Sequence, residues 1–408
     1  MSQLFRKLTV AIIISLFVGV SGIPAISVSE HNSILPDKKV ISNDDQNFDR
    51  KINLLMKIGH IPSLSACIIK NNSVVWSKGY GEFDRENHKK ASTDTIYYVA
   101  SISKSITAVA IMQLYERGLF KLDDNVSKFL PFDLKNPRYP NVNITFRMLL
   151  AHQSSLADHG IEFLLYFSIL GYPHEWFKEY FAPSGFIYNR QVWLDYPPGE
   201  KVYYSSVGYE ILGYLVERIS HQPFGQYCEE HIFKPLNMSN TSFYTSKIDK
   251  DRLAIPYIWL AGMYIWVPHY WWDSASVGAK TTVLDLSHFL IMHMNGGVYE
   301  GTRILNESSV KEMHRVQYPG SYDGGFSHGF GWYSKNYSDG DTYGGHDGNL
   351  PGYKAVMQMR YSDKVGVIFF YNRFQPATRS TKHELIVDIK NFARNQIEKE
   401  LFKKADEL

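Results

Sequence analysis

Two β-hairpin patterns, placed at opposite ends of the chain, constrain the fold more than any other feature of the sequence. The first, LSACIIKNNSVVWSKGYG, predicts two strands joined by a tight turn at Asn71–Asn72. The second, YKAVMQMRYSDKVGVIFFYN, predicts two strands joined by a turn at Ser362–Asp363. The strands therefore lie near both ends of the sequence rather than alternating with helices along it.

The middle of the chain, residues 120–320, is patterned mostly as helix and loop, and helical patterns also occur near 47–58 and 381–403. Segregated strands and helices favour an α+β fold over alternating βαβ units. We predict one antiparallel sheet built from residues 60–100 and 325–375. Helices flank this sheet, and the mostly helical region is inserted between its two halves.

The first 28 residues have the layout of a signal peptide or membrane anchor. Arg6 and Lys7 precede an apolar run from Leu8 to Val20, and small residues follow it. If the segment is not cleaved, its apolar part is long enough to cross a bilayer. Both interpretations place the protein outside the cytoplasm: it is secreted if the segment is cleaved, and associated with the membrane through the N-terminal segment if it is not. A polar linker at 29–46 follows.

The rest of the chain is predicted to form one domain over residues 47–400, followed by a charged tail at 401–408. The chain ends in Ala-Asp-Glu-Leu, which is close to an endoplasmic reticulum retention signal. The lumen of that compartment is therefore an alternative location. The other interpretation of these residues is the charged end of a helix.

Composition excludes several classes of function. The 43 basic residues are nearly balanced by 41 acidic ones, and no basic stripe predicts a nucleic-acid partner. Only two cysteines are present, Cys67 and Cys228, so the chain is not a disulfide scaffold, although the sequence leaves their pairing open. No cluster has metal-ligand spacing, and neither a metal nor a cofactor is predicted. A second long, uninterrupted apolar span is missing, which argues against a membrane transporter.

A serine and a lysine share the start of a predicted helix in YYVASISKSITAVAIMQLYERG. Apolar residues recur at helical spacing from Ile102, and Gly118 ends the pattern. One interpretation is an ordinary helix whose N-cap is Ser101. The other is a nucleophile, because Ser101 and Lys104 share a face at the positive end of the helix. The amine would then take or hold the proton of the hydroxyl.

The same Ser-x-x-Lys spacing occurs a second time, at Ser308 and Lys311 in NESSVKEMH. No strand precedes this copy and no partner motif lies near it. We interpret it as an ordinary polar helix start and assign the nucleophile to Ser101.

A second candidate motif lies in PPGEKVYYSSVGYEILGYLVERI, where a turn precedes an amphipathic helix. Tyr204 and Ser206 sit at this junction. Tyrosine is a poor base at its ordinary pKa of about 10, but a nearby ammonium such as that of Lys104 would favour the phenolate. The alternative interpretation is a packed tyrosine.

The third motif lies in YGGHDGNLPGYKAVMQM, just before the second hairpin. Gly348 would allow a backbone or a ligand to approach closely. An edge strand here would offer a backbone N–H to a developing oxyanion, and His346 would donate from its side chain. The alternative is a glycine-rich turn with an incidental histidine.

In this order and spacing, the three motifs resemble those of the serine β-lactamase and penicillin-binding-protein superfamily. The chain is most similar to the branch of esterases and D-peptidases related to class C β-lactamases. The flanking stretches TFRMLLAHQSSL, TTVLDLSHFLIMHMNGG and HGFGWY also resemble this branch. The resemblance covers about residues 47–400 and implies a β-lactamase/transpeptidase-like fold.

The resemblance also implies a role for each motif residue. Ser101 would be the acyl-accepting nucleophile, Lys104 would hold its proton, and Tyr204 would be the general base. His346 takes the third-motif position, and the backbone N–H groups of Ser101 and Asn349 would form the oxyanion hole. The implied reaction is hydrolysis of a small-molecule ester, amide or peptide through an acyl-enzyme, without a metal or cofactor.

Two departures from the family pattern bear on the substrate. Ser206 stands where the family usually has an asparagine, and His346 replaces a permanently charged lysine. We expect the first change to weaken binding of a substrate amide and the second to weaken binding of a substrate carboxylate. We therefore expect an esterase or D-peptidase with weak or no β-lactamase activity. Because of Ser206, the alternative is a catalytically silent binding or scaffold protein on the same fold.

Aromatic residues are concentrated in two stretches, 162–181 and 255–272, both within the predicted helical insert. One interpretation is an apolar wall for the substrate. The others are a membrane-facing patch and ordinary core packing.

Overall fold

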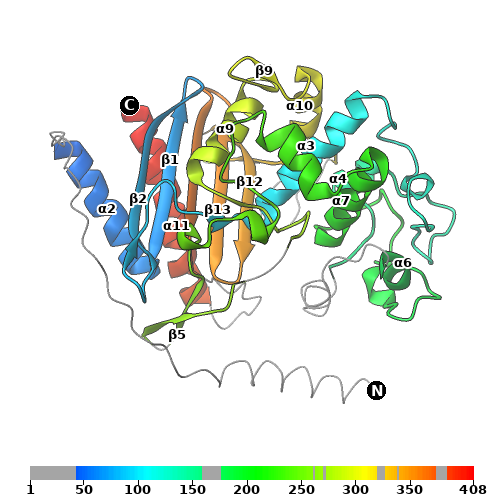
Figure 1. Cartoon of the computed structure of the whole chain (residues 1–408), viewed down its shortest axis with the longest axis horizontal. Helices are drawn as coiled ribbons and strands as arrows, with labels where there is room; N and C mark the ends of the chain where they lie inside the picture. Colours follow the sequence, from blue (N-terminus) through cyan, green and yellow to red (C-terminus); the bar gives the residue numbers. More distant parts are fainter. Residues whose placement is uncertain are drawn as a thin grey trace. The chain divides into compact units, whose positions relative to one another are not determined.

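An eight-stranded antiparallel sheet organises the fold, in the order β10-β11-β12-β13-β14-β1-β2-β3 (Figure 1). The computed structural model describes residues 43–158, 176–260, 262–269, 273–318, 327–337, 340–373 and 384–408. The compact unit to which these elements belong is Asp44–Leu408. The strands of the sheet are β1 Ser63–Lys70, β2 Ser73–Asp84, β3 Lys89–Lys90, β10 Ser327–His328, β11 Tyr333–Asn336, β12 Thr342–Leu350, β13 Tyr353–Arg360 and β14 Val365–Tyr371.

The two ends of the chain meet in the centre of this sheet. Strand β1 pairs antiparallel with β14, in a register that sets Leu64 opposite Tyr371. The expected α+β fold, with one sheet built from both chain ends, is confirmed. The tight turn at Asn71–Asn72 is present as well: both residues have positive φ, 53° and 59°, as a two-residue hairpin of this kind requires.

Both faces of the sheet are buried. Along β1, Leu64, Ala66 and Ile68 belong to one hydrophobic core. Cys67 and Ile69 point to the opposite face and belong to the other core. The near-continuous apolar runs in the central strands follow from this arrangement, because each strand is covered twice.

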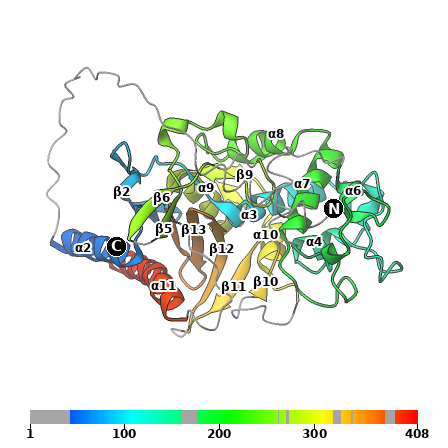
Figure 2. The same cartoon turned by 90° about the horizontal axis from the view of Figure 1, so that it is seen from below.

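Helices cover the two faces of the sheet (Figure 1). Helices α2 and α11 lie side by side over one face and are joined by the ion pairs Lys51–Glu400 and Lys404–Asp45 (Figure 2). Helices α3 and α9 lie on the other side, with α4 and α7 beyond them. The helices are α2 Asn43–Gly59, α3 Ser103–Glu116, α4 Phe146–Leu150, α6 Trp176–Phe181, α7 Ser206–Ser220, α8 Phe224–Cys228, α9 Val283–Met294, α10 Glu307–His314 and α11 Glu384–Glu407.

Short elements connect these helices. The two-stranded pairs are β4 Tyr97–Tyr98 with β7 Lys280–Thr281, β5 Tyr257–Leu260 with β6 Met263–Trp266, and β8 Val298–Tyr299 with β9 Thr302–Arg303. A single 3₁₀ turn, η1 Ala100–Ile102, joins β4 to α3. Other short turns are η2 Val126–Lys128, the π turn η4 Glu229–Phe233, and the 3₁₀ turns η3 Arg190–Val192, η5 Thr245–Lys247 and η6 Lys250–Arg252.

Helix α3 is buried almost all round, although its apolar residues recur at the spacing of a single helix face. Its first twelve residues, Ser103 to Leu114, are all buried. The reason is that helices α7, α8 and α10 pack against α3, which places it inside the molecule. Gly118 follows the helix with φ of 72°, as predicted for a residue just past a helix end.

The last residues of the chain and one of the two aromatic stretches form regular elements. Residues 401–407, expected as a charged tail, form the last turns of α11, and Leu401 and Phe402 are buried in the core that α11 shares with the sheet. The stretch at 255–272 contains the β5–β6 hairpin rather than a helix, and exposes Leu260, Met263 and Trp266. The N-terminal segment 1–42 and most of the other aromatic stretch, 162–175, lie outside the described residues.

Both cysteine thiols, Cys67 and Cys228, are free and buried, so the two cysteines do not pair. Within the described ranges, no helix is long and apolar enough to cross a membrane. The same ranges contain no group of three or more His, Cys, Asp or Glu side chains arranged to hold a metal ion.

Candidate active site

Ser101 lies in η1, on a strained turn between β4 and the buried helix α3. The residue before it, Ala100, has φ of 48°, a left-handed conformation that a non-glycine residue adopts at a cost. Helix α3 starts two residues later, and its N-cap is Ile102 rather than Ser101. Ser101 therefore does not cap the helix with its side chain. Its hydroxyl instead accepts a hydrogen bond from the Lys104 Nζ at 3.1 Å.

Lys104 is fully buried and held by two hydrogen bonds. Its Nζ donates to the Ser101 Oγ and to the backbone carbonyl of Ser276, each at 3.1 Å. Burial lowers the pKa of Lys104 to about 8, although the negative charges of Asp158 and Glu210 oppose this shift. An amine with a pKa near 8 can exchange a proton with its neighbour close to neutral pH. The predicted proton-holding role of Lys104 fits this environment.

The second Ser-x-x-Lys copy has a different environment. Ser308 is exposed in α10, and Lys311 is a surface residue paired with Glu307 one helical turn away. No buried pocket of polar groups surrounds it among the contacts described for α10. The interpretation of this copy as an ordinary helix start fits the structure.

Tyr204 lies beside Lys104, one residue before Ser205, the N-cap of α7. The Lys104 Nζ is 4.9 Å from the centre of the Tyr204 ring. The ring of His346 is 6.2 Å away on another side, measured between ring centres. The structure thus brings together one residue from each of the three sequence motifs, as the resemblance implied.

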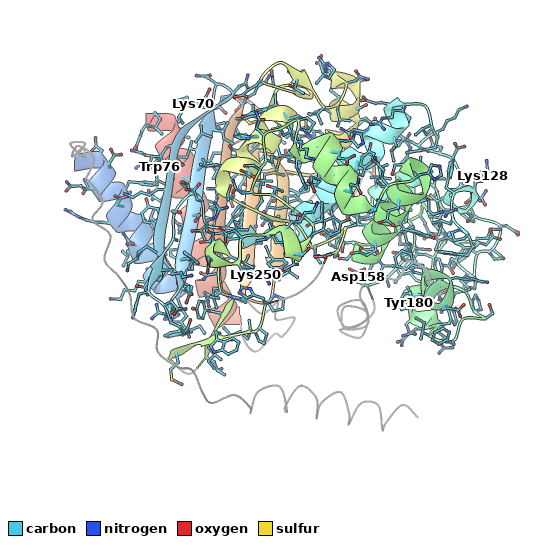
Figure 3. The ribbon with its side chains drawn as sticks, in the orientation of Figure 1. Lys70, Trp76, Lys128, Asp158, Tyr180 and Lys250 are labelled. Carbon is cyan, nitrogen blue, oxygen red and sulfur yellow. The ribbon has the colours of Figure 1, made fainter. Side chains whose placement is uncertain are left out.

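Ser206 is the first residue of α7, and its backbone N–H donates to the carboxylate of Asp158 at 2.7 Å. Asp158, labelled in Figure 3, also accepts from the Val207 N–H and from the hydroxyl of Ser205, the N-cap. A carboxylate at this position complements the positive end of the helix. It also fixes the backbone immediately after Tyr204.

Gly348 allows β12 to touch the turn that carries the nucleophile. A Cβ atom on Gly348 would lie 2.0 Å from the backbone oxygen of Val99 and 3.1 Å from the Cβ of Ala100. Only glycine permits this approach. In the structure, Gly348 therefore allows another part of the backbone to approach closely, one of the two roles predicted for it.

Asn349 is exposed on β12, one residue beyond this contact. Among the described strands, β11 pairs with β12 only as far as Gly345, so residues 346–350 have β13 as their one strand neighbour. The free edge at Gly348 faces the nucleophile turn. The predicted oxyanion hole, made by the N–H groups of Ser101 and Asn349, fits this edge and stays a prediction.

His346 differs from the expected hydrogen-bond donor. Its Nδ1 lies 2.7 Å from the backbone carbonyl of Asp347, which can only accept, so the ring proton is on Nδ1. The other nitrogen, Nε2, therefore carries a lone pair and is an acceptor. Burial, reinforced by the charge of Lys104, lowers the pKa of His346 to about 3. The third motif thus presents a neutral acceptor, where a donor had been expected.

A buried charge network holds the backbone of the third motif. The Asp347 carboxylate accepts from the Tyr333 hydroxyl at 2.6 Å, from Lys354 at 3.0 Å and from Arg394 at 2.8 Å. Burial alone would raise the pKa of Asp347, but the charges of Arg394 and Lys354 hold it below its usual value. Because Arg394 belongs to α11, the last helix of the chain supports the strand that carries His346.

Sequence reasoning missed several supporting residues. Glu210 in α7 is only 2% exposed and accepts hydrogen bonds from both Ser274 and Ser276, whose carbonyl in turn holds Lys104. A lone carboxylate inside the apolar pattern of α7 is a usable signal, because a buried charge requires partners. Asp158 and the Asp347 network carry no comparable local signal.

Comparison with known proteins agrees with this geometry. The family model described as Beta-lactamase matches residues 48–390. The chain belongs to this family, and so to the superfamily of serine β-lactamases and penicillin-binding proteins, a class of serine hydrolases. The resemblance inferred from the three motifs is confirmed.

One curated relative is the protein Flp of Staphylococcus aureus strain MW2, which is 30% identical over 260 residues, covering 63% of this chain and 50% of Flp. The chain spans 64% of Flp from strain N315. It thus spans about half to two thirds of the length of these relatives.

Among solved structures, the octameric penicillin-binding protein homologue from Pyrococcus abyssi has a TM-score of 0.70 at 28% identity, covering 81% of this chain and 73% of that one. The hydrolase EstCE1, described as having promiscuous acyltransferase activity, has a TM-score of 0.66 at 20% identity and covers 86% of this chain and all of its own. The D-amino acid amidase of Ochrobactrum anthropi SV3 has a TM-score of 0.62 at 20% identity, covering 86% of this chain and 99% of its own. The last two show the fold alone.

Proposed function

We propose that the protein hydrolyses carboxylic esters or amides through an acyl-enzyme on Ser101, with weak or no turnover of β-lactams. The observation that carries this proposal is the contact between the buried Lys104 amine and the Ser101 hydroxyl, 3.1 Å apart and beside the Tyr204 ring. This arrangement can activate a serine that is a weak nucleophile on its own. The family membership supports the reaction class.

In the proposed reaction, the Ser101 Oγ attacks the substrate carbonyl carbon while its proton passes to Lys104 or Tyr204. The N–H groups of Ser101 and Asn349 would stabilise the oxyanion that forms. When the bond to the leaving alkoxide or amine breaks, the proton returns to that group. Water then attacks the acyl carbon and gives up a proton to the same base. The bond from that carbon to the Ser101 Oγ breaks, the base returns the proton to the Oγ, and the acid is released.

The third motif argues against efficient β-lactam binding. Penicillins and cephalosporins carry a carboxylate, and a permanent cation near the nucleophile would hold it. At this position the protein has His346, whose pKa of about 3 keeps it neutral and whose Nε2 is an acceptor. A carboxylate would meet a lone pair there rather than a donor.

A panel of substrates tests the proposal. We expect measurable hydrolysis of p-nitrophenyl esters of short or medium chain length. For a chromogenic cephalosporin, we expect a kcat/KM at least about tenfold lower than for the best ester. Rates for D-amino acid amides and D-peptides, measured in the same assay series, show whether the enzyme prefers esters or amides. Fast cephalosporin turnover would contradict the interpretation of His346, and complete inertness to all substrates would support the silent binding protein instead.

We also propose that the N-terminal segment, residues 1–28, directs the protein out of the cytoplasm as a cleaved signal or as an anchor. The proposal depends on the positive start and the apolar run of that segment. Expression of the full chain in a secreting host, followed by carbonate extraction and mass spectrometry of the N-terminus, tests it. Cleavage between residues 20 and 28, or an intact chain that resists carbonate, is expected. An intact chain in the cytosol that carbonate extracts would contradict the proposal.

A further inference from the structure

His152 holds the backbone on both sides of Tyr204. Its own carbonyl accepts a hydrogen bond from the Tyr203 N–H at 2.8 Å. Its side-chain Nδ1 accepts a second one from the Ser205 N–H at 3.0 Å. One residue thus bonds to both neighbours of Tyr204, one through its main chain and the other through its ring.

The ring of His152 also packs on the phenol itself. The two rings are stacked, with centres 4.4 Å apart and planes 29° from parallel. Tyr209 lies against the same imidazole at 5.1 Å, and His328 meets it edge-on at 5.6 Å. Because His152 is only 2% exposed, the stack has little freedom to move.

We propose that His152 is the positioning residue for Tyr204, holding the phenol beside Lys104 by clamping the Tyr203–Ser205 backbone. The proposal rests on the proposed function, in which Tyr204 stands beside Lys104 and takes part in the transfer of the Ser101 proton. His152 itself does not touch the reacting hydroxyl in this assignment. It acts through the orientation of Tyr204.

The clamp requires an unprotonated Nδ1. Because the Ser205 N–H is a donor, Nδ1 must accept, and the neutral ring carries its proton on Nε2. Burial and the nearby positive or ionisable groups, His328 of β10, Lys104 of α3 and His346 of β12, keep the pKa of His152 well below its usual value. The imidazole therefore stays an acceptor over the pH range in which Lys104 titrates.

The backbone conformation of His152 limits which substitutions are informative. Its φ is 59°, in the left-handed region, where asparagine is the best tolerated side chain apart from glycine. His152→Asn keeps an acceptor oxygen near the position of Nδ1 but removes the stacked ring. His152→Phe keeps a stacked ring but leaves the buried Ser205 N–H without its acceptor.

The experiment measures kcat and KM for the best p-nitrophenyl ester, normalised to the sites that a fluorophosphonate titrates. If the clamp positions Tyr204, His152→Phe lowers kcat tenfold to a hundredfold with KM changed less than about twofold, the scale expected for a misplaced base. His152→Asn should retain kcat within about fivefold. The matched control is His221→Phe, because His221 also has φ of 59° but is exposed at the end of α7. This control should match the wild type.

Two outcomes would overturn the proposal: wild-type kcat in His152→Phe, or an equal loss of kcat in both variants. If His152→Phe does not fold, His152→Asn decides alone, since a loss above fivefold contradicts the acceptor role and a smaller loss supports it. Failure of the proposed function is a separate result, because the wild type itself would then neither react with the fluorophosphonate nor hydrolyse esters.

Discussion

Replacement of Ser101 by alanine is expected to lower ester hydrolysis by at least about 10⁴-fold in kcat, the scale seen when a catalytic nucleophile is removed. The substitution deletes the hydroxyl that accepts a hydrogen bond from the buried Lys104 amine. Since Ser101 does not cap α3 with its side chain, the loss of the hydroxyl should cost little stability. Steady-state rates and fluorophosphonate labelling, followed by mass spectrometry of the labelled peptide, measure the effect.

Ser308→Ala is the matched control, because Ser308 has the same Ser-x-x-Lys spacing but lies exposed in α10. It should keep wild-type rates and label at Ser101. Undiminished activity in Ser101→Ala, or label found on Ser308, would exclude Ser101 as the nucleophile.

The second large effect is expected at Lys104. Lys104→Met keeps an unbranched buried side chain but removes the amine, and we expect a fall of at least about 10³-fold in kcat/KM. The wild-type pH profile gives an independent readout. Below a pKa of about 8 the amine is protonated and cannot take the Ser101 proton, so kcat/KM should rise about tenfold per pH unit and level off above pH 8. His346, with a pKa of about 3, should add no inflection between pH 5 and 9.

Lys280→Met is a demanding control for this experiment. Lys280 is also fully buried, burial likewise lowers its pKa to about 8, and it is bonded to Asp273 and to the carbonyl of Phe243. Its removal should lower the free energy of unfolding without changing kcat per titrated site. Lys104→Arg keeps a permanent charge and should lose both the rate and the inflection. A flat wild-type profile through pH 8 would show that the Lys104 amine is not the group whose titration limits the reaction.

Local patterns were enough to predict the two central hairpins of the sheet, β1–β2 and β13–β14, and that the sheet is built from both ends of the chain. Hairpin signals such as Asn71–Asn72 act within a few residues, and the apolar runs of β1 and β14 reflect burial on both faces. The β5–β6 hairpin was not predicted, because its strands are short and aromatic and mimic a buried helix segment. For the last residues of the chain, the interpretation as the charged end of a helix is the correct one, although the charged residues there hid the burial of Leu401 and Phe402.

The three motifs identified the residues that meet in the site, but not how the site is held. The Nε2 of His346 is an acceptor because its Nδ1 donates to the Asp347 carbonyl, and the sequence gives no sign of this contact. Asp158 and His152 hold the backbone next to Tyr204 from far away along the chain. Asp158 bonds to Ser206, 48 positions later, and His152 bonds to Ser205, 53 positions later. Such long-range contacts form only when the chain folds, so they could not be predicted from local patterns in one sequence.

The pairing of β1 with β14 has a consequence for biosynthesis. Ser63, at the start of β1, bonds to Asn372, which lies 309 positions later, so the middle of the sheet cannot close until residue 372 has left the ribosome. Until then β1 and β2 have one uncovered edge, and the Arg394 that steadies the strand bearing His346 has not been made. A truncated translation product should accordingly be both inactive and aggregation-prone, and the waiting period during synthesis or export is when the chain most needs a chaperone.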